Sequence, residues 1–216
     1  MASHLKLIIF DLDGTLIDAY PAITSSFNYT MRAVGMPQQP AEVIRRAVGR
    51  GDRNLLAPYV KAAAVDRALR VYRRHHAGAL RAHTRLYPSV KSLLAGLKKR
   101  GIILAVASNR PTKFSLIVLR HLGIRRYFDA VLCKDAVRFG KPHPLMLNML
   151  MRRFKAGPRD TMYVGDMAID GEAGRRAHVK TVMVTTGSST RGELGKYRPF
   201  AIVGRVKDII GVIDKA

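Results

Sequence analysis

Short apolar runs alternate along most of the chain with segments whose apolar residues follow helical spacing. The run in residues 5–10 is nearly continuous, as expected of a central strand buried on both faces. Further runs predict strands at residues 102–107, 130–133, 161–164, 181–184 and 201–203. Between them, apolar residues recur three and four positions apart, as at Val90, Leu93, Leu94 and Leu97. This alternation predicts an α/β fold with a doubly wound, mostly parallel, Rossmann-like sheet covered on both faces.

Residues 19–85 follow a different pattern, which is helical and rich in arginine, with no convincing strand. Pro21 begins a predicted helix that ends near Gly35, and a second helix covers residues 41–48. Asp52 is the expected N-cap of the next helix, and a longer helix reaches His83. We therefore expect a small all-α domain of residues 19–85, inserted into a core made of residues 1–18 and 86–216.

Polar residues gather where the predicted core strands end. Strand alternation puts the side chains of Asp11 and Asp13 on the same side, and Gly14 then lets the chain turn away. Two neighbouring carboxylates at a buried strand end repel each other unless a cation or a shared proton relieves them. Taken alone, such acids also fit a simple turn cap. The ends of other strands and the start of a helix add Ser108, Asn109, Lys141, Asp166 and Asp170. Because ligands bind at the carboxyl ends of parallel strands, we expect these residues to form one site.

Composition is typical of a globular protein, with 48% apolar residues among 216. No apolar run is long enough to span a bilayer, and Asp11 and Asp13 interrupt the N-terminal run too early for a secretory signal. The single cysteine, Cys133, lies in an apolar segment and is expected to be an inert core thiol. One cysteine forms no intramolecular disulfide, which is compatible with the cytoplasm, our expected location.

The charge balance is strongly basic, with 38 Lys and Arg against 15 Asp and Glu, a net charge of +23. Such a charge attracts anionic substrates, nucleic acid or anionic surfaces, and it also arises from surface composition alone. The basic residues are spread over the whole chain, without interleaved aromatic residues or a dense basic tail. We therefore expect nonspecific binding to nucleic acid at low salt. A basic nucleic-acid-binding module remains the non-enzymatic alternative, which DNA binding tighter than micromolar at physiological ionic strength would favour.

Four motifs in this order resemble those of the haloacid dehalogenase-like hydrolase superfamily: DLDGT at 11–15, SN at 108–109, KP at 141–142 and GDMAID at 165–170. The resemblance covers almost the whole chain and includes LYPSV at 86–90. The helical segment after the first motif is similar to the small α-helical cap of that family. Gly49-Arg50-Gly51 resembles a loop that is common in the caps of the phosphoglycolate phosphatase-like branch.

The resemblance implies a role for each motif residue. Asp11 would be the nucleophile that forms an aspartyl-phosphate, and Asp13 the general acid and then the general base. Asp11, the backbone carbonyl of Asp13 and Asp166 would bind Mg²⁺, with Asp170 orienting a ligand or a metal-bound water. The transferring oxygens would be held by Ser108, the backbone N–H of Asn109 and Lys141.

The implied activity is a Mg²⁺-dependent phosphatase acting on a small phosphorylated metabolite, with 2-phosphoglycolate as the first candidate. Asp13 favours a phosphatase over a dehalogenase, which needs no acid at that position. A phosphosugar mutase and a pyrophosphatase or nucleotidase remain alternatives on the same core, and the oligomeric state is open.

The helical segment is expected to close over the substrate, with hinges near residues 17–19 and 85–88. Arg50 and Arg53 are candidates to contact the non-reacting end of the substrate, although solvated arginines explain them equally well. His75, His76 and His83 lack a recognisable spacing of metal ligands and are expected to be packed or solvated.

Overall fold

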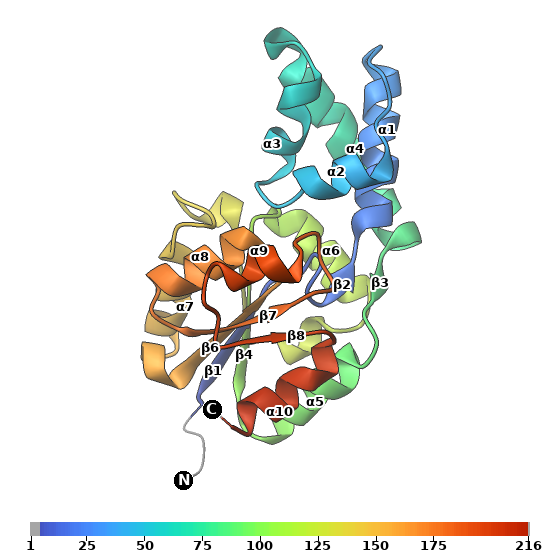
Figure 1. The fold of residues 1–216 in the computed structure, drawn as a ribbon. Coiled ribbons are helices and arrows are strands. Elements are labelled where there is room, and N and C mark those ends of the chain that lie inside the picture. The colour runs from blue at the N-terminus through green and yellow to red at the C-terminus, as the bar shows by residue number, and fades with distance from the viewer. Residues whose placement is uncertain (1–4, 216) are drawn as a thin grey trace.

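A computed structural model describes residues 5–215 and shows a single parallel sheet with a group of helices above one of its ends (Figure 1). The sheet has six strands in the order β5-β4-β1-β6-β7-β8, and every neighbouring pair is parallel. The predicted α/β class and sheet type are thus confirmed. The strands are β1 (Leu7–Phe10), β4 (Ile103–Ser108), β5 (Ala130–Cys133), β6 (Thr161–Gly165), β7 (Lys180–Val184) and β8 (Ala201–Val203).

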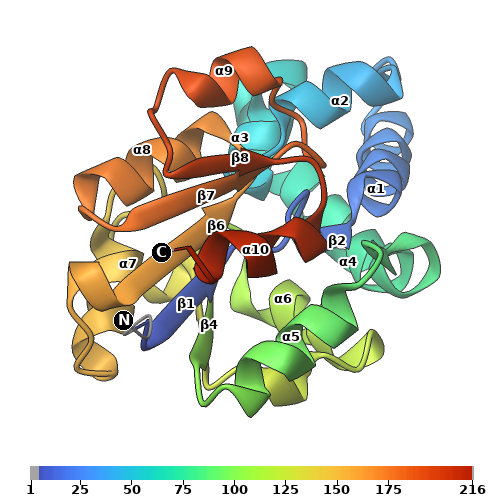
Figure 2. The same ribbon diagram turned by 60° about the horizontal axis from the view of Figure 1, so that its bottom comes forward.

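Helices cover both faces of the sheet because alternate residues of each strand point to opposite sides. Leu7 and Ile9 belong to the apolar cluster formed with α7 (Leu145–Arg153) and α8 (Ala168–Arg176). Ile8 and Phe10 belong to the other cluster, which includes residues of α5 (Val90–Lys99), α6 (Thr112–His121) and α10 (Ile209–Ile213). Figure 2 shows α5 and α10 close together on that face. A short helix, α9 (Arg191–Gly195), precedes β8.

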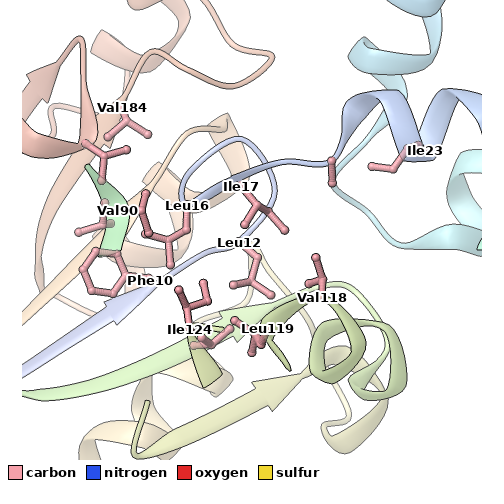
Figure 3. Packing of buried hydrophobic residues seen from close by; sticks show 14 of the residues in the cluster. Phe10, Leu12, Leu16, Ile17, Ile23, Val90, Val118, Leu119, Ile124 and Val184 are labelled. Carbon is pink, nitrogen blue, oxygen red and sulfur yellow. The ribbon is translucent and has the colours of Figure 1, made fainter. Parts of the chain in front are cut away.

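The turn after β1 is anchored by apolar residues on its inner side. Figure 3 shows Leu12, Leu16 and Ile17 within the same buried cluster as Val118 of α6. All three residues of the turn are fully buried. The two acids of the first motif therefore lie on a segment that is fixed by the core, although it follows the end of the strand.

The helical insert consists of α1 (Tyr20–Ala33), α2 (Ala41–Ala47), α3 (Asp52–Leu56) and α4 (Val65–His83). It lies beyond the carboxyl ends of the core strands (Figure 1). Short 3₁₀ turns follow α3 at Ala57–Tyr59 and precede α4 at Ala62–Ala64. Two short antiparallel strands, β2 (Ile17–Asp18) and β3 (Arg85–Leu86), connect the insert to the core, so Arg85 pairs with Asp18 instead of extending a helix. The division into two domains at residues 18–19 and 85–86 remains a prediction.

Some helix starts differ from those expected from sequence. Gly51, with φ of +89°, takes the N-cap position of α3, while the carboxylate of Asp52 accepts a hydrogen bond from the backbone N–H of Arg53. Pro111 precedes α6, and Thr112, the first residue of this helix, donates its N–H and its hydroxyl to Asp135. The helix that follows Lys141 begins only at Leu145. Residues before proline are biased away from helical backbone, and both Pro142 and Pro144 lie in this stretch.

The remaining packing expectations concern Cys133 and the membrane. The Cys133 thiol is fully buried, its Sγ lies 3.3 Å from Ser115 Oγ, and burial raises its pKa. It is therefore a core thiol, as predicted. Among residues 5–215, none of the helices combines the length and apolar character needed to cross a membrane.

Candidate active site

The ends of β1, β4 and β6 meet next to one another because β1 lies between the other two strands. From β1 the chain builds one half of the sheet through β4 and β5, and it then returns to β6 to build the other half. Such a reversal point is where open parallel sheets bind ligands. Asp11 lies at this point, with its backbone N–H donating to the carbonyl of Val164 at 2.9 Å.

Three buried carboxylates form the centre of the site. Asp11, Asp166 and Asp170 each offer an oxygen, and these oxygens all lie within 4.8 Å of one another. Thr15 Oγ1 donates to Asp166 Oδ1 at 2.8 Å. Gly14, with φ of +83°, approaches the other oxygen of Asp166 so closely that a Cβ at position 14 would collide with it. The turn of the first motif is thus packed directly against the carboxylate of the last one.

Lys141 lies between two of these acids. Its Nζ is 2.7 Å from Asp11 Oδ1 and 2.7 Å from Asp170 Oδ1, and the residue is only 5% exposed. Burial disfavours the ammonium, but the two carboxylates outweigh it and raise the pKa of Lys141. The lysine is therefore charged, and it compensates part of the negative charge of the cluster.

Asp170 uses both of its oxygens to hold neighbouring groups. Oδ1 accepts from Lys141 Nζ and from the hydroxyl of Tyr163, the latter at 2.6 Å. Oδ2 accepts from the backbone N–H groups of Asp166 and Met167, at 3.2 and 3.0 Å. A carboxylate with four such donors is suited to orienting Lys141 and the loop after β6.

Electrostatics in the cluster favour a cation. Burial, together with the charges of Asp170 and Asp13, raises the pKa of Asp11 to about 7, although Lys141 lowers it. Burial and the charges of Asp170 and Asp11 also raise the pKa of Asp166. Three buried carboxylates with one lysine leave an excess of negative charge, and carboxylate oxygens are the ligands that Mg²⁺ prefers. The donor set therefore fits a magnesium ion held by Asp11 and Asp166, with Asp170 beside them.

Asn109 links three segments through its side chain. Its Nδ2 donates to the carbonyl of Gly49 and to the carbonyl of Lys141, both at 2.9 Å. Its Oδ1 accepts from the backbone N–H of Lys141, also at 2.9 Å. The structure thus joins the end of β4, the segment before α7 and the glycine-flanked loop of the helical insert. The sequence pointed only to the backbone N–H of Asn109, and this linking role of its side chain was missed.

Asp13 is paired with a residue that the sequence did not single out. Asp13 Oδ1 forms an ion pair with Arg110 Nη2, and the side chain of Arg110 is only 6% exposed. The backbone N–H of Arg110 donates to Ser108 Oγ at 3.2 Å. Spacing gave no signal for this role, because Arg110 is one of 38 basic residues and only its burial distinguishes it.

A cavity lies between the sheet edge and the helical insert. Its volume is about 60 Å³, which corresponds to a few waters at ~10–15 Å³ each. The expected residues Asp11, Asp13, Ser108, Asn109 and Lys141 all line it, whereas Arg50 and Arg53 are not among the lining residues. Arg53 forms an exposed ion pair with Asp66. The insert instead contributes side chains that include Leu55, Tyr72 and His76, as well as the backbone of Gly49 and Gly51.

Of the three histidines, His76 is packed at the wall of this cavity. Its Nδ1 lies 2.9 Å from Ser26 Oγ, and its ring stacks on Tyr72. Within residues 5–215, the acidic triad of Asp11, Asp166 and Asp170 is the only group of three or more potential His, Cys, Asp or Glu ligands close enough to share a metal.

Comparison with known proteins gives one consistent result. Residues 8–184 match the family model for haloacid dehalogenase-like hydrolases. The phosphoglycolate phosphatase of Aquifex aeolicus is 30% identical over 210 residues, covering 97% of both chains. That of Haemophilus influenzae is 34% identical over 203 residues, covering 87% of this chain and 88% of the relative. The crystal structure of a predicted phosphoglycolate phosphatase from Haemophilus somnus superposes with a TM-score of 0.91 at 30% identity, covering 97% and 98% of the two chains.

Proposed function

Because the chain belongs to the haloacid dehalogenase-like hydrolases, we propose that it is a Mg²⁺-dependent phosphatase that hydrolyses a small phosphate monoester. The observation that carries this proposal is the arrangement of Asp11 at the strand end, with Lys141 at 2.7 Å and Asp166 in the same carboxylate cluster. Three separated segments of the chain supply these groups to one cluster. Such an arrangement is suited to placing a phosphorus atom against Asp11 Oδ1 or Oδ2 while cations compensate its oxygens.

In the first half of the reaction, a carboxylate oxygen of Asp11 attacks phosphorus, and the bond from phosphorus to the ester oxygen breaks. Asp13, in its protonated form, donates a proton to the leaving alcohol oxygen. An aspartyl-phosphate remains on Asp11. One displacement that is difficult with water becomes two easier steps, which is the advantage of a covalent intermediate.

In the second half, Asp13 takes a proton from a water molecule, and the water oxygen attacks phosphorus. The bond to Asp11 breaks, so inorganic phosphate and the free carboxylate are formed. Lys141 and Ser108 donate hydrogen bonds to the phosphoryl oxygens in both halves. A bound Mg²⁺ would supply positive charge beside those oxygens, and Asp11, the carbonyl of Asp13 and Asp166 would hold it.

Two positioning roles support these steps. Asp170 holds Lys141 toward Asp11, and Tyr163 holds Asp170 through its hydroxyl. The helical insert acts as a cap that closes over the substrate and excludes bulk water, with β2 and β3 at the two hinges. The bond from Asn109 to Gly49 is one contact that closure of this cap uses.

The substrate we infer is a small carboxylated phosphate ester, with 2-phosphoglycolate first. The names of the relatives at about 30% identity support this choice.

The test is a phosphate-release screen over a panel of metabolites, performed with Mg²⁺ and again with a chelator. We expect release of inorganic phosphate from 2-phosphoglycolate that is lost with chelator and restored by added Mg²⁺. Conversion of a sugar phosphate into its isomer without phosphate release would instead identify a mutase. No Mg²⁺-dependent release from any monoester, diphosphate or nucleotide would overturn the proposal.

A further inference from the structure

The wall of the cavity contains a buried guanidinium, that of Arg110, in which one terminal nitrogen lacks a hydrogen-bond partner in the described part of the chain. Arg110 is 7% exposed, and its Nη2 forms the ion pair with Asp13 Oδ1. Its Nη1 is buried and has no hydrogen-bond partner within residues 5–215. A buried donor on a charged group is costly when it is left unpaired, because water no longer solvates it. The structure thus contains an N–H group in the lining of the site that lacks an acceptor.

The surroundings of Arg110 make this donor stand out. The side chains that share the wall include Ile23, Leu55 and Phe114, which are apolar. Burial and the charge of Arg110 lower the pKa of His76 to about 2, so the imidazole is neutral. The nearby acid Asp52 is compensated by Arg73, whose Nε is 2.7 Å from Asp52 Oδ2. Arg110 pairs with Asp13 through Nη2, so its Nη1 is the cationic donor that remains available to a ligand on this side, in surroundings that strengthen an ion pair.

We propose that Arg110 binds a second anionic group of the substrate, a carboxylate or a second phosphate, through its free Nη1. This inference rests on the proposed phosphatase function, in which the transferred phosphoryl group lies at Asp11 and Lys141. The substrate then spans the cavity, with its reacting end at the lysine and its second anion at the arginine. Such a charge-assisted hydrogen bond gives both affinity and orientation.

The position of Arg110 also couples substrate recognition to acid–base catalysis. The same guanidinium that receives the second anion holds Asp13 through Nη2. A substrate without a second anion leaves Nη1 unpaired and buried, so it is bound less well in the ground state and the transition state. Arg50 and Arg53, which the sequence suggested for this role, lie outside the cavity lining.

The experiment compares Arg110→Gln with wild type on three substrates in Mg²⁺: 2-phosphoglycolate, ethyl phosphate and ethylene glycol bisphosphate. The readout is the ratio of kcat/KM for each of the two substrates with a second anionic group to kcat/KM for ethyl phosphate. We expect Arg110→Gln to lower this ratio about 10- to 100-fold for the preferred substrate. A merely structural role, or an effect through Asp13 alone, lowers all three values together and leaves the ratio unchanged. The two ratios also tell which anion, carboxylate or phosphate, is recognised.

Matched variants keep the test decisive. Arg120→Gln makes the same change at an exposed residue in the last turn of α6, and it should leave the ratio unchanged. If Arg110→Gln does not fold, Arg110→Lys keeps the charge but lacks the second N–H arm, and it should also lower the ratio. An unchanged ratio in the folded Arg110 variant, or a lowered ratio in Arg50→Gln or Arg53→Gln instead, overturns the inference.

A binding readout separates this inference from the proposed function. In an Asp11→Asn background, where turnover is removed, the increase in Tm with 2-phosphoglycolate or the bisphosphate is compared with that from ethyl phosphate. We expect a larger increase with a substrate that has a second anion, and loss of this difference on adding Arg110→Gln. Absence of phosphate release by wild type would overturn the function alone, while equal increases for all three ligands would overturn the role of Arg110.

Discussion

The carboxyl end of the sheet, called the sheet edge here, and the helical insert differ in how deeply their charged side chains are buried. At the sheet edge, Asp11, Asp170 and Lys141 are buried and their charges are compensated within a few ångströms. In the insert, the arginines that form ion pairs have side chains that are about half exposed, as in Arg53 with Asp66 and Arg46 with Glu193. Exposed pairs contribute about 0–1 kcal/mol each, whereas removing one partner of a buried pair costs about 3–5 kcal/mol.

This difference matches the tasks that we assign to the two regions. A reacting centre needs side chains fixed to within about half an ångström, which buried, mutually bonded groups provide. A cap that opens and closes needs contacts that break at little cost. Arg45 and Arg46 donate to the backbone carbonyls of Thr186, Gly187 and Ser188, and such surface contacts between insert and core suit that requirement.

The largest expected effect is at the sheet edge, in Asp11→Asn. We expect the rate of phosphate release to fall at least about 10³-fold, because an amide does not replace the attacking carboxylate. The fold should persist, since Asn keeps an oxygen that accepts from Lys141. Phosphate release and the melting curve are measured together. Asp214→Asn, at an exposed acid that pairs with Arg100, is the matched control and should keep full activity. Full activity in Asp11→Asn would contradict the covalent mechanism.

The sequence predicts the strands and motif residues of the molecule well, but it predicts poorly which side chains contact one another. The strands were predicted from apolar runs, and the polar residues of the site from their places at strand ends and helix starts, while their roles came from the resemblance to a family. These signals are local, because a buried parallel strand must be apolar and its end must turn. The partners Tyr163 and Arg110 were missed, since their roles depend on which side chains face them across the sheet. Arg50 and Arg53 were named as candidates for an anion contact, with solvated arginines as an equal alternative, because sequence does not distinguish a buried arginine from an exposed one.

A smaller but still large effect is expected for Asp166→Asn, which tests the metal site. Activity should fall about 100-fold or more, and a higher Mg²⁺ concentration should be needed, because one anionic ligand is lost. Without metal, however, the variant should melt at the same or a higher temperature than wild type. Burial and the charges of Asp170 and Asp11 raise the pKa of Asp166, so its ionised form is disfavoured in the metal-free fold.

The measurement is Tm with chelator and with added Mg²⁺ in both proteins. Mg²⁺ should raise the Tm of wild type, and it should raise that of Asp166→Asn less. An equal Mg²⁺ response in the two proteins would show that Asp166 does not bind the ion. A strongly lowered Tm in chelator would show that the carboxylate is needed for folding itself.

A direct contrast of the two regions comes from Asp170→Ala and Arg53→Ala. Removing Asp170 takes away one of the two carboxylates that hold the buried Lys141, and it leaves the hydroxyl of Tyr163 and two backbone N–H groups without this acceptor. We therefore expect a loss of about 3–5 kcal/mol in the free energy of unfolding. Removing Arg53 breaks only an exposed pair and should cost less than about 1 kcal/mol. Tyr163→Phe removes one donor to Asp170 and should cost about 1 kcal/mol. Urea unfolding measures all three, and equal losses for Asp170→Ala and Arg53→Ala would contradict the contrast.

The last effect, smaller than that of Asp170→Ala, concerns pH and His76, the buried histidine of the helical insert. Burial, with the charge of Arg110, lowers its pKa to about 2, so the folded protein keeps it neutral while the unfolded chain binds a proton below about pH 6.5. Its contribution to stability is therefore present above pH 6.5 and is lost progressively as the pH falls toward 2. At pH 5 the loss is about 2 kcal/mol, or roughly 4–8 °C in Tm.

Asp11 has the opposite sign, since its pKa is raised to about 7 in the fold and its contribution is lost as the pH rises through that value. The test therefore uses a difference between two proteins. The change in Tm from pH 7.5 to pH 5 is measured in wild type and in His76→Gln, with the exposed His83→Gln as the matched control. We expect wild type to lose several degrees relative to His76→Gln over this interval. An identical change in both proteins would mean that His76 accepts a proton in the folded state as readily as in the unfolded chain.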